Sequence, residues 1–180
     1  MNNTYIALMR GINVSGQKKI LMADLRTYLE ESSFYNVRTY IQSGNIIFES
    51  EIANVGEITE KIKSVIKDRY GFDVPTLVRT KQYLLDVVKS NPFVEQTEEN
   101  SKRIYLTFLD KYPDVEFVHK LKEIDYSPEE WEIQQDYIYF YSPDNYGNAK
   151  MSNNLFEQKL KVSATTRNWR TVNKLIELAD

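Results

Sequence analysis

The chain has 180 residues, of which 42% are hydrophobic and 27% are charged, with 6 Gly and 5 Pro. This composition is typical of a globular protein with one large domain or two small ones, and it excludes low-complexity and collagen-like chains. No apolar run approaches the roughly 18 residues of a membrane span, and the first residues lack the pattern of a secretory signal, so we expect a cytoplasmic protein. There is no Cys and a single His, His119, which excludes disulfides and His or Cys metal sites; neither a metal nor a cofactor is predicted.

The net charge of −3 conceals an uneven distribution. Residues 1–90 carry 12 basic and 10 acidic side chains, residues 91–149 carry 5 and 13, and residues 150–180 carry 6 and 3. Nucleic-acid binding normally needs a basic surface. The acidic middle therefore disfavours a nucleic-acid partner, and any polyanion would have to bind near the ends of the sequence.

The first 80 residues show the element order βαββαβ. Strands are predicted at 4–9, 37–41, 46–48 and 74–78, and helices at 22–32 and 54–70. Asn54 followed by Glu57 resembles a capping box, which marks the start of the second helix. This order predicts a ferredoxin-like βαββαβ sandwich, in which two helices cover one face of a sheet.

The remaining residues predict a second, smaller unit. A helix capped by Thr80 is followed by a strand at 103–109, a helix at 114–123, a hairpin of 131–133 and 137–141, and helices at 152–161 and 167–178. We therefore expect an α+β protein with a ferredoxin-like domain at 1–80, a linker helix and loop at 81–101, and a βαββ domain with two C-terminal helices at 102–180. Whether the second unit is a degenerate copy of the first stays open at this point.

Two segments of the first unit combine glycine with polar residues. The loop from Arg10 to Gly16 follows the first strand, and the turn Gln42-Ser-Gly-Asn45 follows the second. A crossover helix makes these two strands parallel, so both segments are expected at the same end of the sheet, beside residues 70–75. Loop N–H groups ahead of a helix suit an anion, and Arg, Lys and amide side chains can neutralise and orient it. The candidate ligand-binding residues here are Arg10, Gly11, Asn13, Gly16, Lys18, Gln42, Ser43, Gly44 and Asn45. The alternative is structural, because Gly11, Gly16 and Ser43-Gly44-Asn45 would also simply permit turns.

The segment Ala164 to Trp169 is a second candidate. Either Thr166 or Asn168 could cap the last helix, whose buried stripe is predicted as Trp169, Val172, Ile176 and Ala179. In a functional interpretation this basic, hydroxyl-rich segment closes over the first loop. In a structural interpretation, which we favour, it provides a cap and an aromatic anchor. The candidate ligand-binding residues added here are Lys150, Thr166, Arg167, Asn168 and Trp169.

Strand 137–141 places Tyr137, Tyr139 and Tyr141 on one face and Ile138 and Phe140 on the other. Aromatic rows can stack nucleic-acid bases. No basic residue flanks this row, so packing or a protein interface is the favoured interpretation. The single histidine, His119, lies beside a lysine in a predicted helix, and we expect it at the surface.

Several blocks of the sequence resemble the signature of bacterial domain-of-unknown-function family 1697. They are Arg10-Gly-Ile-Asn-Val-Ser-Gly16, Met22-Ala-Asp-Leu-Arg26, Arg38-Thr-Tyr-Ile-Gln-Ser-Gly-Asn45 and Ala164-Thr-Thr-Arg-Asn-Trp169. The resemblance spans nearly the whole chain and departs at Ser15, where the family pattern usually has Gly. It implies a shared fold and site without implying a reaction, because the family is uncharacterised. It also implies that the loop, the turn and the C-terminal segment belong to one signature.

We therefore expect a protein that binds a small anionic ligand, phosphate-like or nucleotide-like, at the loop after the first strand. An enzyme, a transferase or hydrolase, using the same pocket is the main alternative; Lys150 or Asp24 would be its general base. A nucleic-acid module using the sheet of the first unit, and a protein-interaction domain using the tyrosine row, are further alternatives. The oligomeric state is left open.

Overall fold

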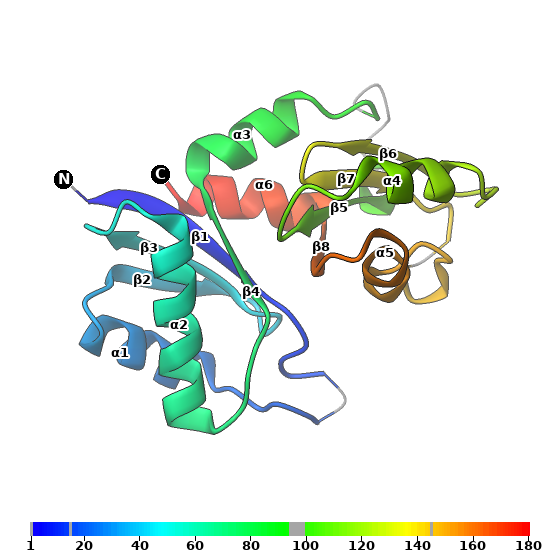
Figure 1. The fold of residues 1–180 in the computed structure, drawn as a ribbon. Coiled ribbons are helices and arrows are strands. Elements are labelled where there is room, and N and C mark those ends of the chain that lie inside the picture. Colours follow the sequence, from blue (N-terminus) through cyan, green and yellow to red (C-terminus); the bar gives the residue numbers. More distant parts are fainter. Residues whose placement is uncertain (1, 15, 94–99, 145) are drawn as a thin grey trace. The chain divides into compact units, whose positions relative to one another are not determined.

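The structure, a computed structural model, describes residues 2–14, 16–93, 100–144 and 146–180, and Figure 1 traces its elements along the chain. The first elements are β1 (Asn3–Met9), α1 (Met22–Glu31), β2 (Tyr35–Tyr40), β3 (Asn45–Ser50), α2 (Val55–Tyr70), β4 (Thr76–Thr80) and α3 (Lys81–Lys89). They are followed by η1 (Asn100–Arg103), β5 (Ile104–Leu109), α4 (Val115–Lys122), β6 (Glu130–Gln134), β7 (Tyr137–Tyr141), η2 (Tyr146–Asn148), α5 (Asn153–Leu160), β8 (Ala164–Asn168) and α6 (Trp169–Leu178). The α+β class predicted from the sequence is confirmed.

The chain divides into two compact units, one of Met1–Val87 with Lys174–Asp180 and one of Val88–Asn173. The division falls within α6, whose last residues group with the first unit. The domain limits expected from the sequence, at 80 and 102, stay predictions, and residues 94–99 of the expected linker at 81–101 lie outside the described residues.

The sheet of the first unit has the strand order β2-β3-β1-β4, with every neighbouring pair antiparallel. This is the ferredoxin-like order, in which β1 and β2 point the same way on either side of β3. Helices α1 and α2 lie side by side on one face of this sheet (Figure 1). The residues packed between helices and sheet include Leu25, Leu29, Ile58, Ile62, Ile66, Tyr5, Ala7, Ile46 and Phe48. The helical spacings of their α1 and α2 members are the ones that predicted these two helices.

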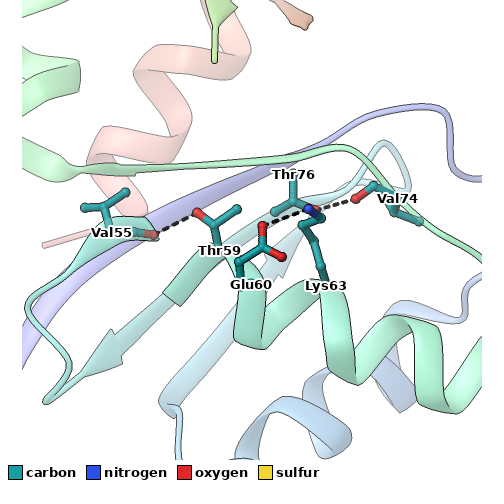
Figure 2. Close-up of polar contacts among 6 residues, drawn as sticks. All are labelled: Val55, Thr59, Glu60, Lys63, Val74 and Thr76. Atoms are coloured by element: carbon teal, nitrogen blue, oxygen red, sulfur yellow. Dashed lines mark hydrogen bonds and ion pairs between the residues drawn. The ribbon is translucent and has the colours of Figure 1, made fainter. Parts of the chain in front are cut away.

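The polar contacts where α2 runs beside β4 are local (Figure 2). The Thr59 hydroxyl donates to the Val55 carbonyl at 2.8 Å, and the Lys63 ammonium lies 2.8 Å from the Glu60 carboxylate. In β4 the Thr76 hydroxyl donates to the Val74 carbonyl at 3.1 Å. Each bond joins residues that are close in sequence, so apolar contacts carry the packing of α2 onto the sheet.

The second unit has one more strand than the sequence predicted. Residues Ala164–Asn168 form β8, which pairs antiparallel with β5 and completes a sheet of order β6-β7-β5-β8. This segment was predicted to be a loop and the first turn of a helix. With β8 in place the second unit repeats the βαββαβ order and the sheet order of the first, which answers the question left open above. Helices α4 and α5 pack on this sheet through Leu121, Phe156 and Leu160.

The start of α6 confirms one cap prediction and corrects the predicted stripe. Asn168 is the cap, since its side-chain oxygen accepts from the Thr171 N–H at 2.7 Å. The buried positions of this helix are Thr171, Val172 and Leu175, with Ala179 just beyond its end, whereas Trp169 and Ile176 are only partly buried. The predicted stripe was therefore wrong at Leu175, which it omitted.

Two of the three tyrosines of β7 are buried, and Tyr141 is only partly buried. Tyr137 is 7% exposed and Tyr139 is 0% exposed, while Ile138 and Phe140 face the helix-covered core of the second unit. The low exposure of Tyr137 and Tyr139 favours the packing interpretation. The face of the first sheet opposite α1 and α2 is equally inaccessible at Ile6, Leu8 and Ile47, each 0% exposed. His119 is exposed, as predicted.

None of the helices in the described residues is long and apolar enough to cross a membrane. In the same part of the chain, no group of three or more His, Asp or Glu side chains is placed to hold a metal ion.

Candidate functional site

The loop between β1 and α1 is held together by the side chain of Asn13. Its amide nitrogen donates to the carbonyls of Ile20 and Gln42, both at 3.0 Å, and its oxygen accepts from the Ile20 N–H at 2.9 Å. Asn13 has φ of 54°, a left-handed conformation that Asn tolerates better than most residues. Asn13 thus closes the loop on itself and ties it to the turn after β2, as the parallel direction of β1 and β2 predicted.

The turn after β2 is packed against the end of β1. The Met9 N–H donates to the Gly44 carbonyl at 2.8 Å. Asn45 is 0% exposed, and its amide nitrogen donates to the Tyr40 carbonyl and the Ser43 hydroxyl, both at 3.0 Å. The side chain of Asn45 therefore shapes the turn, as that of Asn13 shapes the loop.

Residues 70–75 reach the same end of the sheet. The Arg10 N–H donates to the Pro75 carbonyl at 2.9 Å, and the Lys18 ammonium donates to the Asp73 carbonyl at 2.6 Å. The Lys18 ammonium also lies 5.9 Å from the centre of the Phe72 ring. The pKa of Asp73 lies below its ordinary value, chiefly because its carboxylate accepts a hydrogen bond from Lys67. The three segments expected to meet here do meet, with Lys18 directed to the 72–73 side.

A surface cleft of 340 Å³ opens beside this cluster, at the start of α1. It is lined by Leu21, Met22, Ala23, Asp24, Arg26, Thr39, Ile41 and Gln42. We call it the α1 cleft. Among the residues that line the α1 cleft, Gln42 was predicted from the sequence to bind a ligand. Leu21, Arg26, Thr39 and Ile41 were not predicted, although Arg26, Thr39 and Ile41 lie inside two of the signature blocks.

The N-terminus of α1 lacks a side-chain cap. Leu21 occupies the cap position with φ −74° and ψ 116°, the usual cap geometry, but no side chain of the described residues accepts from the first N–H groups of the helix. Every other α-helix in the described residues begins with such a bond, and the capping residues are Asn54, Thr80, Asp114, Ser152 and Asn168. The partial positive charge of the α1 N-terminus is therefore available to a ligand in the α1 cleft.

Arg26 adds a full positive charge to the same cleft. Its guanidinium donates to the Thr39 hydroxyl at 2.8 Å. Within the described residues no carboxylate pairs with Arg26, in contrast to Lys67, Arg69 and Lys81, whose charges are paired with Asp73, Glu31 and Asp180. The position of Arg26 is fixed by Thr39, and most of its N–H groups remain for a ligand.

The candidate residues of the second unit have structural partners there. The Thr166 hydroxyl bonds the hydroxyl of Thr107 and the side-chain oxygen of Asn153, both at 2.7 Å. The Lys150 ammonium donates to the Ser127 carbonyl at 2.8 Å. Arg167 lies on β8 and not at the start of a helix; it is 8% exposed and donates to the Thr166 carbonyl at 2.9 Å. Burial lowers the pKa of Arg167 to about 10. Trp169 is half-buried at the start of α6.

Tyr70, at the end of α2, has a buried hydroxyl for which the described residues provide no hydrogen-bond partner. Burial raises the pKa of Tyr70 to about 12, with smaller contributions from the negative charge of Asp24, which lines the α1 cleft, and from Tyr28. Its folded-state pKa lies above the ordinary value of 10.0, so the ionisation of Tyr70 has no effect on stability below pH 10. As the pH rises from 10 to 12 the unfolded chain ionises first, and stability is lost.

We expect Tyr70→Phe to stabilise the protein by up to about 1 kcal/mol at neutral pH, because it removes a buried unsatisfied hydroxyl. The gain should grow above pH 10, where Tyr70 opposes folding in the wild type. Urea unfolding at pH 7 and in the alkaline range measures both effects. A substantial loss of stability at neutral pH would mean that the hydroxyl has a partner after all.

Fold and site together define an α+β protein of two ferredoxin-like units, whose first unit carries a cleft lined by both Arg26 and Asp24. Residues 2–139 match the model of the family described as "Protein of unknown function (DUF1697)", and the chain belongs to this family. A solved structure described as that of a conserved bacterial protein from Streptococcus pneumoniae is similar over 100% of both chains, with a TM-score of 0.78 and 22% identity. At that identity the likeness shows the fold alone. No curated protein matches the chain.

Proposed function

We propose that this protein binds a small anionic ligand, phosphate-like or nucleotide-like, in the α1 cleft. The observation that carries the proposal is the uncapped N-terminus of α1, which opens onto the same cleft as Arg26. Helix N-termini bind anions through N–H groups that lack an intrahelical partner. A guanidinium held by Thr39, and not paired with any carboxylate of the described residues, supplies the complementary charge.

The residues predicted from the sequence take two different parts in this proposal. Gln42 lines the α1 cleft and can orient the ligand through its amide. Asn13 and Asn45 are positioning residues, since their amide nitrogens are bonded within the loop and the turn. Arg10 and Lys18 add positive charge nearby, which favours the approach of an anion.

Asp24 is the one carboxylate among the residues that line the α1 cleft, and it is exposed. Its charge favours the N-terminus of α1 but repels an anionic ligand. An enzyme could use such a carboxylate as a general base, and this position is the only observation that favours the enzyme alternative. Lys150, the other candidate base, belongs to the second unit and donates to Ser127. Binding is therefore the function that the geometry supports best.

Leu21→Asp tests the proposal, because an aspartate at this position supplies the missing cap and places a negative charge where the ligand would bind. We expect a gain in unfolding free energy of about 1 kcal/mol together with a loss of affinity for inorganic phosphate of about tenfold or more. Isothermal titration with inorganic phosphate and urea unfolding measure the two effects on the same samples. Asp24→Asn removes a repulsive charge and should tighten phosphate binding by roughly threefold.

Leu21→Ala is the matched control, because it removes the leucine side chain and leaves the N-terminus uncapped. It should retain phosphate affinity within about threefold of the wild type, since alanine neither caps the helix nor adds charge. If wild-type protein shows no saturable phosphate binding, or if Leu21→Asp binds phosphate as well as Leu21→Ala does, the proposal is wrong.

A further inference from the structure

The two ferredoxin-like units allow the α1 cleft to be compared with its counterpart in the same chain. The residue before the first helix of each unit is Leu21 in the first and Asp114 in the second. The residue after the second strand is Ile41 in the first and Gln135 in the second. At both positions the second unit has a polar residue, and the first has a large apolar one.

Backbone conformation and helix capping do not explain why Leu21 and Ile41 are apolar. Asp114 accepts from the Glu116 N–H at 2.8 Å, which is the bond that Leu21 fails to make. Ile41 and Gln135 adopt the same left-handed conformation, with φ of 51° and 50°. The fold therefore requires that conformation in both units, but a β-branched residue is the least suited to it. Neither residue serves the local structure as well as its counterpart.

Burial does not explain them either. Leu21 is 69% exposed and Ile41 is 52% exposed, so neither belongs to the core. Single exposed apolar residues are ordinary on a protein surface. These two, however, line one cleft, together with the guanidinium of Arg26 and the amide of Gln42. Departures from local rules that gather at one place are expected at functional sites.

We propose that the ligand carries an aromatic ring next to its anionic group and that this ring lies against Leu21 and Ile41. The inference rests on the proposed function and adds the chemical class, a phosphate monoester of an aromatic or heteroaromatic body. The cleft volume of 340 Å³ is at the lower end of the range for small-molecule sites, which suits a ligand of nucleotide size. The amide of Gln42 can both donate to and accept from the edge of a heteroaromatic ring. Covering the two apolar side chains supplies affinity that an anion alone cannot obtain.

The experiment is an isothermal titration of the whole chain with inorganic phosphate, ribose phosphate, phenyl phosphate and the common nucleoside monophosphates. We expect phenyl phosphate to bind at least about tenfold more tightly than ribose phosphate, because only the former covers Leu21 and Ile41. A further gain for one nucleoside monophosphate would identify a nucleotide as the source of the ring, and no further gain would identify a simpler aryl phosphate.

Ile41→Asn removes the apolar contact and suits the left-handed conformation. We expect the ratio of phenyl phosphate to ribose phosphate affinity to fall to about threefold or less, while the thermal midpoint of unfolding rises. Val14→Asn is the matched control, since Val14 is 60% exposed in the neighbouring loop but does not line the cleft. It should leave the ratio unchanged.

The proposed function and the further inference are contradicted by different results. Inorganic phosphate binding without a preference for the ring overturns this inference and leaves the proposed function standing. The absence of any phosphate binding overturns both. A change in the oligomeric state of Ile41→Asn without a change in the ratio would show that the apolar pair serves a protein interface, and that too overturns the inference.

Discussion

Gly44→Ala is expected to lower the unfolding free energy of the protein by about 2–5 kcal/mol. Gly44 has φ of 79°, which an alanine adopts only with strain. A Cβ at this position would also lie 2.7 Å from the Cβ of Met9 and 2.9 Å from the Cδ1 of Ile12. Both neighbours are buried, at 0% and 1% exposed, so they cannot move aside. Urea unfolding monitored by circular dichroism measures the loss.

Gly71→Ala separates backbone strain from steric overlap. Gly71 ends α2 with nearly the same φ, 78°, but a Cβ there would meet no atom within 4 Å. Gly71→Ala therefore introduces backbone strain alone, and we expect it to lower the free energy of unfolding by about 1 kcal/mol. Equal losses for Gly44→Ala and Gly71→Ala would show that the turn after β2 is not packed against the end of β1 in the way described.

The second large effect is expected for Asn13→Ala, which should lower the free energy of unfolding by about 2–3 kcal/mol. The substitution removes three hydrogen bonds that join the loop to itself and to the turn. It also places an alanine at φ of 54°, which Asn tolerates better. Because these bonds position the start of α1, phosphate affinity should fall as well. Denaturant unfolding and isothermal titration with phosphate measure the two consequences.

Asn36→Ala is the control for the strain that an alanine experiences at a positive φ. Asn36 has a similar φ, 49°, but its amide makes one exposed bond, of 2.8 Å, to Glu49. Asn36→Ala should lower the free energy of unfolding by about 1 kcal/mol or less and leave phosphate affinity unchanged. If Asn13→Ala is no more destabilising than Asn36→Ala, the side chain of Asn13 does not hold the loop.

The fold could be predicted from the sequence wherever an element has a clear apolar period. The stripe Ile58, Ile62 and Ile66 fixed α2, and its cap at Asn54 lies where the capping pattern placed it. β8 could not be predicted in this way. Its residues Ala-Thr-Thr-Arg-Asn are short and mostly polar, and they suit a helix cap as well as a strand. It pairs with β5, which is more than 50 residues away in sequence, and local patterns carry no information about such pairing.

The candidate site could be predicted in part. The meeting of the Arg10–Gly16 loop with the turn at Gln42 follows from the direction of β1 and β2 alone, and the bond from Asn13 to Gln42 shows it. The sequence does not reveal that the amides of Asn13 and Asn45 are used within the backbone, because the same residues would also suit a ligand. It also gives no reason to place Leu21 and Ile41 at the surface, since apolar residues beside predicted elements usually face the core.

A titration of isotope-labelled protein with inorganic phosphate, followed by amide NMR, tests the central claim most directly. The account predicts saturable shifts of the N–H groups of Met22, Ala23 and Asp24, which begin α1 and lack a side-chain cap. The capped N-terminus of α4, at Val115 and Glu116, should not respond. Equal shifts at both helices, or no saturable shift at α1, would contradict the claim that the α1 cleft is an anion site.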